Sequence, residues 1–172
     1  HIMQTTPTKM RSYIIDKNNV AYLKKLKTII LGGEAFPEDL KQRLLSNEQI
    51  SVFNLYGPAE TTVWSTSSII KNNTDITIGT PIANTQIYII DSDNQLLPVG
   101  VAGELCIAGD GVGKGYLNRP DLTKEKFVSN PFATGANHHG KILYHTGDLA
   151  RWRADGEIEY LGRMDTQVKI HG

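Results

Sequence analysis

The chain has 172 residues, a length that suits one ordinary domain with a sizeable core. Its 18 basic and 18 acidic residues give a formal net charge of zero, so the composition carries no electrostatic signature for binding nucleic acid or an anionic membrane. A single cysteine, Cys106, excludes a disulfide within the chain and favours a reducing, cytoplasmic compartment, and no apolar run approaches the roughly 20 residues that span a bilayer.

The first part of the chain alternates helical and strand patterns. Residues 1–2 read as a cloning remnant and are assigned to no element. Residues 6–7 (Thr-Pro) are a favourable helix start, and residues 28–31 form the short apolar run typical of a parallel strand covered on both faces. A second helix is predicted over residues 36–45 and a second strand over residues 51–55. This order of elements predicts an α/β unit.

Beyond about residue 79, short strands dominate the pattern. Turn chemistry, such as Ala-Asp-Gly at residues 154–156, separates them, and one helix is predicted near residues 121–126. Residues 135–140 are interpreted as a mobile surface loop. The pattern predicts a small barrel or curled sheet built from residues 86–90, 104–108, 141–144, 149–153 and 157–160.

Residues 54–62 (Asn-Leu-Tyr-Gly-Pro-Ala-Glu-Thr-Thr) are the first junction with candidate chemistry. They follow the carboxyl end of a predicted parallel strand, where ligands bind in open α/β sheets. Gly57 and Pro58 force a turn, and Glu60 then offers a hard oxygen ligand suited to Mg²⁺ that carries phosphates. A turn with a carboxylate is more often only a turn, so the residues alone leave both interpretations open.

Three later junctions carry weaker signals. The glycines of residues 109–117 would let backbone approach a phosphate, but a structural loop with glycines at positive φ is favoured. Asp148, read at a strand start beside a glycine, suits two hydrogen bonds from a ribose diol, or caps a turn. Arg163 and Lys169 suit anionic oxygens, or form a solvated strand edge.

The order of these segments and their amino-acid sequences together resemble the adenylation domains of nonribosomal peptide synthetases. Four stretches resemble the motifs NxYGPTE, GELxIxGxGxxxGYL, YxTGDL and GRxDxQVKIRG of adenylate-forming enzymes, namely residues 54–62, 103–117, 144–149 and 162–172. The resemblance covers nearly the whole chain. It is closer to the peptide-synthetase branch than to the luciferase or acyl-CoA synthetase branches.

This resemblance implies the α/β portion of the adenylation-domain core followed by a small distorted β-barrel subdomain, truncated at both ends. Residues 4–80 would be a partial α/β subdomain with the pocket and the metal-binding glutamate. Residues 81–162 would be the β-rich subdomain, and residues 163–172 the hinge and the start of a further C-terminal subdomain.

The resemblance also implies a reaction and its cofactors. Such enzymes join an amino acid to ATP with Mg²⁺, and pass the aminoacyl group to the phosphopantetheine thiol of a peptidyl carrier protein domain, beside a condensation domain of the same synthetase. By motif position, Glu60 would hold Mg²⁺, Arg163 would act at the nucleotide, and Asp165 would be the hinge. The nucleotide would contact Gly33, Glu34, Ala35, Asn54, Tyr56, Asp148, Tyr160 and Arg163.

The same resemblance gives part of an amino-acid pocket. Its five positions are Leu31, Gly33, Leu55, Val63 and Trp64. None is charged, so a charged substrate side chain would lie unpaired there. The indole of Trp64 would fill volume, which favours glycine as the substrate; the alternative is that Trp64 only packs against a sheet.

Two other functions stay open on the sequence. The chain is alternatively a fragment of an aryl- or acyl-acid CoA-ligase type of adenylating enzyme, or a non-catalytic excised subdomain. It contains neither a Ser/Thr/Gly-rich phosphate loop with lysine nor the family's C-terminal catalytic lysine. We therefore expect that the chain alone does not form an adenylate.

Overall fold

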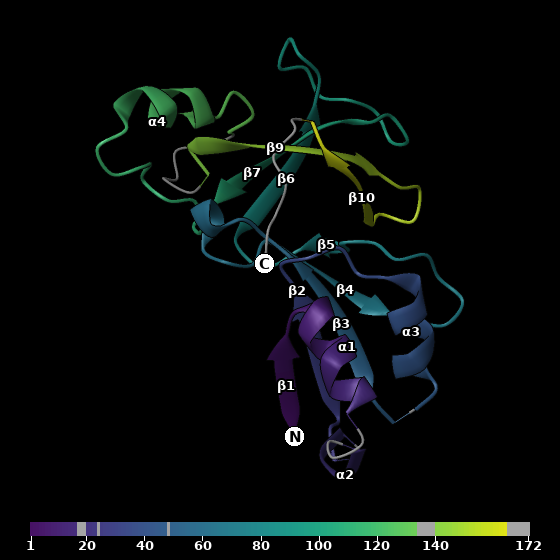
Figure 1. Cartoon of the computed structure of the whole chain (residues 1–172). Helices are drawn as coiled ribbons and strands as arrows, with labels where there is room; N and C mark the ends of the chain where they lie inside the picture. Colours follow the sequence, from purple (N-terminus) through teal and green to yellow (C-terminus); the bar gives the residue numbers. More distant parts are fainter. Residues whose placement is uncertain (17–19, 24, 48, 134–139, 165–172) are drawn as a thin grey trace.

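The computed structural model of the chain describes all residues except 17–19, 24, 48, 134–139 and 165–172. It holds two five-stranded sheets, drawn one above the other in Figure 1. Three helices, α1 (Pro7–Ile15), α2 (Val20–Leu23) and α3 (Glu38–Leu45), belong to the lower sheet, and α4 (Pro120–Lys126) lies beside the upper one. No helix in the described part of the chain is long and apolar enough to cross a bilayer.

The first sheet is mixed. In spatial order its strands are β1 (Ile2–Thr5), β2 (Thr28–Gly32), β3 (Ser51–Tyr56), β4 (Thr66–Ile70) and β5 (Thr80–Pro81). The first three run parallel, and β4 and β5 add antiparallel to them. The predicted α/β order is confirmed, whereas β1, β4 and β5 are missing from the sequence prediction.

The N-terminal segment belongs to this fold. Ile2 pairs with Thr28 in the β1–β2 ladder, so the interpretation of residues 1–2 as outside the fold is wrong. The predicted helix start is confirmed: the Thr6 hydroxyl accepts a hydrogen bond from Lys9 N–H at 3.4 Å, and Pro7 occupies the first turn, where its missing N–H is not needed.

Successive side chains of β2 alternate between the two faces of the first sheet, and this alternation decides which of them pack in the apolar core between that sheet and its helices. Ile29 and Leu31 are 1% and 0% exposed, and they pack with Met10 of α1 and Leu40 of α3. Since successive side chains of a strand point to opposite faces, Ile30 and Gly32 lie on the other face. That second face is turned away from the apolar core beneath the helices.

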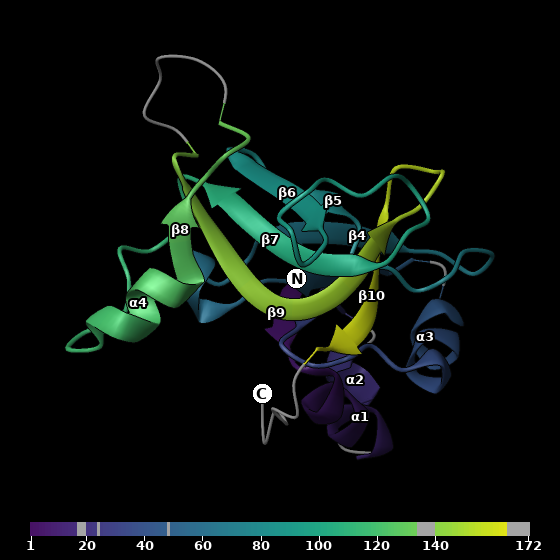
Figure 2. The ribbon, with the colours of Figure 1, turned by 90° about the horizontal axis from the view of Figure 1, so that it is seen from above.

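The second sheet is curled. Its strands are β6 (Thr85–Ile90), β7 (Gly103–Gly109), β8 (Phe127–Ser129), β9 (Ile142–Trp152) and β10 (Ile158–Arg163), in the order β10-β9-β7-β6 with β8 against β9. Figure 2 shows β9 bending through the sheet as one long curved strand. Among the described residues the ladder runs from β10 to β6 without closing, so the curled sheet stops short of a complete barrel.

The continuity of β9 corrects the sequence prediction. The two strands expected over residues 141–144 and 149–153 are joined, since residues 142–152 form one strand of 11 residues. The ladder with β7 shifts register there: Leu105 faces Asp148, but Cys106 faces His145. Such a bulge bends a strand without ending it, and the left-handed φ of +71° at Gly147 accommodates it. Asp148 thus lies inside a strand and not at a strand start.

Gly79 lies where the two sheets meet. Its carbonyl accepts a hydrogen bond from Ile158 N–H at 2.8 Å, and Ile78 N–H donates to Ile158 O at 2.9 Å. Its φ is +79°, and a Cβ at this position would lie 1.9 Å from the Ser67 carbonyl oxygen. Only glycine fits this close backbone approach, which joins β10 to the edge of the first sheet.

We expect Gly79→Ala to lower the free energy of unfolding by about 3 kcal/mol, because a positive φ costs roughly 1–2 kcal/mol and overpacking about 1–3 kcal/mol. In a chain of this size the Tm should fall by roughly 6–12 °C, which thermal unfolding measures. Gly100→Ala is the matched control, since its φ is +88° but nothing lies within 4 Å of an added Cβ. Equal losses for both variants would contradict the steric explanation.

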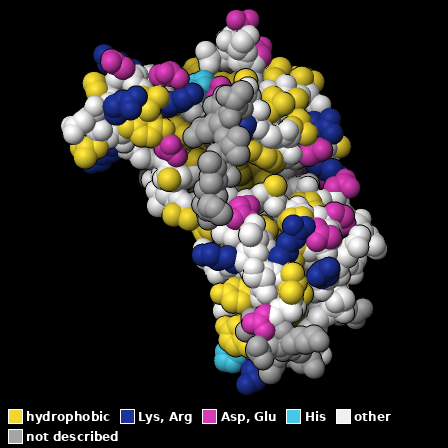
Figure 3. Space-filling view, in the orientation of Figure 1, with side chains coloured by type: hydrophobic (Ala, Val, Ile, Leu, Met, Phe, Trp, Pro, Cys, Tyr) yellow, Lys and Arg dark blue, Asp and Glu magenta, His cyan; other side chains and the backbone are white. Residues whose placement is uncertain are grey.

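Charged side chains are distributed without a dominant sign. Figure 3 shows acidic and basic groups interspersed over one face of the molecule. This distribution agrees with the zero net charge of the sequence. The distinguishing features of the molecule are therefore the specific polar clusters between and within its two sheets.

Candidate functional site

A cavity of about 440 Å³ lies between the two sheets. This volume is within the range of pockets that bind small organic ligands, roughly 300–1,000 Å³. One wall comes from the ends of β2 and β3, and the other comes from the segment before β5 and from β10. The lining residues are Gly33, Glu34, Ala35, Phe36, Asn54, Leu55, Tyr56, Gly57, Ile76, Thr77, Ile78, Tyr160 and Arg163.

Most of the predicted nucleotide contacts meet at this cavity. Gly33, Glu34 and Ala35 follow β2, and the Glu34 carboxylate is tied to the start of α1 by hydrogen bonds from Thr8 N–H at 3.0 Å and the Thr8 hydroxyl at 2.6 Å. The amide of Asn54 is buried and donates to the Thr77 carbonyl at 2.7 Å. Since that bond fixes the amide, Asn54 shapes the cavity wall as a rigid group.

Asp148 is the polar centre behind this wall. The residue is 2% exposed, and its carboxylate accepts hydrogen bonds from the Tyr56 hydroxyl, from Tyr160 at 3.4 Å and from Arg163 Nη1 at 3.2 Å. Arg163 also donates to the Thr146 carbonyl at 2.7 Å. A buried carboxylate needs such partners, so these contacts stabilise a negative charge at the edge of the cavity.

The tyrosine at this centre remains a hydrogen-bond donor at neutral pH. Burial, followed by the charge of Asp148, raises the pKa of Tyr56 well above its ordinary value. A carboxylate offers about four lone-pair sites, and three donors already use most of them. A diol that binds Asp148 must therefore replace or share the Tyr56, Tyr160 or Arg163 contact.

Glu60 belongs to a second polar cluster. It lies in a short 3-10 turn, Ala59–Thr61, and accepts a hydrogen bond from the Tyr116 hydroxyl at 2.6 Å. Tyr116 in turn lies 3.4 Å from the hydroxyl of Tyr144 on β9. Burial, and then the bond to Glu60, raises the pKa of Tyr116, so this hydroxyl stays protonated and donates.

The carboxylates of Glu60 and Asp148 do not share the cavity, although contacts of both reach strand β9. Glu60 is not among the residues that line it. Tyr144, which belongs to the Glu60 cluster, is four residues before Asp148 on the same strand, with the bulge between them. Asp148 lies behind the cavity wall and Glu60 lies in a separate cluster, so the described structure does not bring the two carboxylates around one hollow.

The glycine-rich loop after β7 supports the Glu60 turn. Gly113 N–H donates to the Glu60 carbonyl at 2.8 Å, and the Thr62 hydroxyl donates to the Gly111 carbonyl at 2.7 Å. A Cβ at Gly111 would lie 2.8 Å from the Thr61 carbonyl oxygen. Gly109 and Gly115 have the positive φ values that the structural interpretation predicts, +123° and +126°, and Gly111 permits the close backbone approach.

The turn itself is strained, which the sequence prediction missed. Thr62 and Val63 have φ values of +62° and +73°, and such values are unusual for β-branched residues. Strain of this kind persists where the surrounding structure fixes it, often at functional sites. Here the loop contacts at Gly111 and Gly113 hold the turn in place.

The five predicted substrate positions have four different placements. Gly33 and Leu55 line the cavity, whereas Val63 is 54% exposed. Leu31 is 0% exposed within the first core, so its prediction as a pocket residue is corrected: its side chain lies on the opposite face of β2. Trp64 packs on the other face of that strand.

Gly32 contacts Trp64, a contact that the sequence prediction missed, and neither residue is among those that line the cavity. A Cβ at Gly32 would lie 2.4 Å from the Trp64 ring and 2.6 Å from the Leu55 carbonyl oxygen, so the indole covers bare backbone. The period-two alternation of residues 28–32 carried this information, because it separates Leu31 from Gly32. The predicted hinge Asp165, and also Lys169, lie outside the described residues.

Comparison with protein families gives one match in keeping with this geometry. A family model described as "AMP-binding enzyme" matches residues 1–117. Tyrocidine synthase 3 of Brevibacillus parabrevis is 48% identical over 161 residues, which cover 92% of this chain and 2% of that protein. The dimodular nonribosomal peptide synthase of Bacillus subtilis (strain 168) is 45% identical over 174 residues, covering 100% of this chain and 7% of that protein. The chain thus spans a small part of these relatives.

Solved structures agree with these sequences. PA1221, described as a nonribosomal peptide synthetase protein containing adenylation and PCP domains, superposes with a TM-score of 0.86 at 27% identity, covering 99% of this chain and 34% of that chain. AB3403, a four-domain nonribosomal peptide synthetase bound to AMP and glycine, has a TM-score of 0.82 at 37% identity, covering 99% and 12% of the two chains.

Proposed function

Since the chain belongs to the AMP-binding enzyme family, in the adenylation domains of nonribosomal peptide synthetases, we propose that it supplies the nucleotide wall of a domain that activates an amino acid with ATP. Amino acid and ATP give aminoacyl-AMP and pyrophosphate. The aminoacyl group then passes to the phosphopantetheine thiol of a peptidyl carrier protein domain, and a condensation domain uses it. Enzymes of this family are ligases.

One observation carries the proposal. Tyr56 on β3 and Asp148 on β9 are 92 residues apart in the sequence, yet they share a hydrogen bond beside a cavity of small-ligand size. We assign the ribose hydroxyls of the nucleotide to Asp148. The adenine lies against Asn54, Tyr56 and the backbone of residues 33–35, and Tyr160 contacts the nucleotide from the β10 side.

Arg163 has two tasks in this proposal. It pairs with Asp148 at 3.2 Å, which orients the carboxylate. Its guanidinium also lines the cavity, where it offers positive charge to the phosphate oxygens as negative charge develops at the α-phosphorus. Asp165, two residues later, is proposed as the hinge at which the domain changes shape between its two half-reactions.

The carboxylate of Glu60 is chemically suited to bind Mg²⁺. Mg²⁺ in proteins is held by one or two carboxylates together with substrate phosphates, and Glu60 is a partly buried carboxylate on a turn fixed by Gly113. When bound, the ion neutralises charge on the phosphates. The Tyr116 hydroxyl, which donates to Glu60 Oε1 at 2.6 Å, orients the carboxylate.

Glycine is the proposed substrate. Gly33, Leu55, Val63 and Trp64 present no charge, and Trp64 covers the backbone of Gly32, so little volume is left for a substrate side chain. AB3403, which is 37% identical to this chain, is described with glycine bound. This likeness supports the assignment, and the Trp64 variant argued below tests it.

We expect Glu60→Gln in the complete adenylation domain to raise the Mg²⁺ concentration needed for half-maximal pyrophosphate exchange about tenfold. One charge-assisted contact of roughly 1.5 kcal/mol is lost, whereas the amide oxygen still accepts from Tyr116. Glycine-dependent exchange, measured over a range of Mg²⁺ concentrations, gives the value. Glu125→Gln is the control, because that side chain is 64% exposed and pairs with Lys126. An unchanged Mg²⁺ requirement in Glu60→Gln would remove the metal role.

A further inference from the structure

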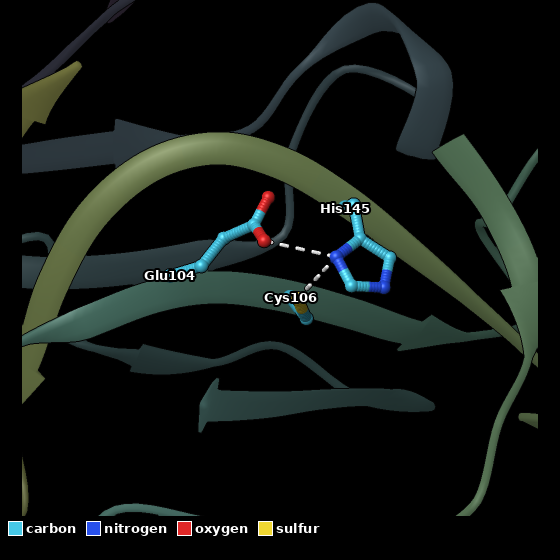
Figure 4. Close-up of side chains that lie close together, drawn as sticks. All are labelled: Glu104, Cys106 and His145. Atoms are coloured by element: carbon cyan, nitrogen blue, oxygen red, sulfur yellow. Dashed lines mark hydrogen bonds and ion pairs between the residues drawn. The ribbon is translucent and has the colours of Figure 1, made fainter. Parts of the chain in front are cut away.

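A three-residue cluster in the second sheet has no part in the proposed activation reaction. Glu104 and Cys106 lie on β7, and His145 lies on the adjacent β9 (Figure 4). His145 Nδ1 is 2.9 Å from Glu104 Oε2 and 3.6 Å from Cys106 Sγ. One ligand atom from each residue lies within 4.8 Å of the other two. We propose that this cluster binds a divalent transition-metal ion, with Zn²⁺ as the best-suited ion.

The strand geometry explains why the three side chains converge. Glu104 and Cys106 are two residues apart on β7, so they point to the same face of the sheet. The register pairs Cys106 with His145 directly across the ladder, which brings the imidazole to that face as well. The bulge formed by residues 146–147 sets this pairing, because without the shift His145 would oppose a different residue.

The two separations that involve His145 are close to those of a metal site, and the Glu104–Cys106 separation is within 4.8 Å. In a tetrahedral zinc site with bonds of about 2.0–2.3 Å, ligand atoms are on the order of 3.4–3.6 Å apart. The His145–Cys106 separation of 3.6 Å already agrees, and the His145–Glu104 separation of 2.9 Å needs an increase of only a few tenths of an ångström. Side-chain rotation of the longer glutamate supplies that movement.

The donor types select the class of ion. A thiolate, an imidazole and a carboxylate form a mixed set of the kind that Zn²⁺, Co²⁺ and related ions accept, while Mg²⁺ and Ca²⁺ prefer oxygen. Cys106 is fully buried, but the side chains of His145 and Glu104 are 16% and 19% exposed. Solvent therefore reaches one side of the cluster, where water serves as the fourth ligand.

A second contact orients the carboxylate. Glu104 Oε1 accepts a hydrogen bond from Gly147 N–H at 2.9 Å, which leaves Oε2 directed at His145. Outer contacts of this kind orient metal ligands and contribute to affinity. On binding, the Cys106 thiol gives its proton to solvent and the sulfur forms the bond to the ion. The ion would then join β7 to β9 at His145, two residues before Gly147.

The chain offers a specific spectroscopic test, because Cys106 is its only cysteine. Titration of the 172-residue chain with Co²⁺ is expected to give a thiolate-to-cobalt charge-transfer band that saturates at one ion per chain. Zn²⁺ should displace the Co²⁺. At a hundredfold excess of Zn²⁺ over its Kd, the Tm should rise by roughly 5–10 °C relative to the chain with chelator.

Substitution of each proposed ligand tests whether that side chain binds the ion. Cys106→Ser should lose the band, and His145→Gln and Glu104→Gln should each weaken Co²⁺ binding at least about tenfold. The latter two are partly exposed, so they test the site even if Cys106→Ser folds poorly. His138→Gln/His139→Gln is the control, since it removes two adjacent imidazole donors that lie elsewhere in the sequence.

Two results would overturn the proposal. One is the absence of a thiolate band at millimolar Co²⁺ in a chain whose unfolding transition shows that it is folded. The other is a band or a Zn²⁺-dependent Tm shift that persists in His145→Gln and Glu104→Gln but disappears in the His138/His139 control. Neither readout depends on nucleotide or amino acid, so failure here leaves the proposed activation reaction unaffected.

Discussion

Replacement of Asp148 by Asn is expected to weaken AMP binding and glycine-dependent pyrophosphate exchange by the complete domain at least about a hundredfold. Hydrogen bonds to a charged group contribute roughly 1.5–3 kcal/mol each, and the proposal gives Asp148 two of them to the ribose. Their loss adds up to about 3 kcal/mol, which corresponds to two powers of ten in affinity.

The amide also disturbs the partners of Asp148. Asparagine has one acceptor oxygen and an NH₂ group that donates, while Tyr56, Tyr160 and Arg163 all donate toward the carboxylate. One donor would therefore face another donor in a buried site. Arg163 would also lose its ionic partner, so the cavity wall would change its charge as well as its hydrogen bonds.

A matched variant separates this effect from a general loss of charge. Asp75→Asn removes a carboxylate that pairs with Arg153 at 2.8 Å, but its side chain is 74% exposed. It should leave the Kd for AMP unchanged, because exposed pairs contribute little. Calorimetry with AMP gives both Kd values, and thermal unfolding checks that each protein is folded. Wild-type affinity in folded Asp148→Asn would refute the assignment of the ribose.

The sequence was sufficient for features that depend on neighbouring residues. The helix start at Thr6, the apolar strand at residues 28–31 and the structural role of the glycine loop follow from local propensity and are confirmed in the structure. The motif order also identified the family. The structural inferences use residues close together in the chain, where propensity and spacing carry the information, whereas the family follows from four local motifs in a fixed order.

Features that depend on residues far apart in the chain could not be predicted from the sequence. The expected break between residues 144 and 149 fails because the bulge opposite residues 105–106 absorbs two extra residues and keeps β9 continuous. The bond between Glu60 and Tyr116 joins residues 56 positions apart, and no local pattern predicts it. Leu31 differs from these cases, because the alternation of residues 28–32 already indicates that its side chain faces the first core, where the structure places it.

The Trp64 position leads to the second large expected effect, a change of substrate. Trp64→Ala in the complete domain should raise the ratio of alanine-dependent to glycine-dependent exchange about a hundredfold. A methyl group admitted to or excluded from an apolar pocket changes discrimination by roughly 10–200-fold, and here the indole lies against the bare backbone of Gly32. Its removal opens the volume that the Ala substrate needs.

Trp152 is the other tryptophan of the chain and provides the control. It packs against the core of the second sheet, so Trp152→Ala should reduce stability without changing the ratio. If Trp64 only packs against its sheet, both variants will lower the Tm and both will retain the glycine preference. A changed ratio in Trp64→Ala alone assigns the indole to the substrate pocket, because lost packing by itself does not distinguish glycine from alanine.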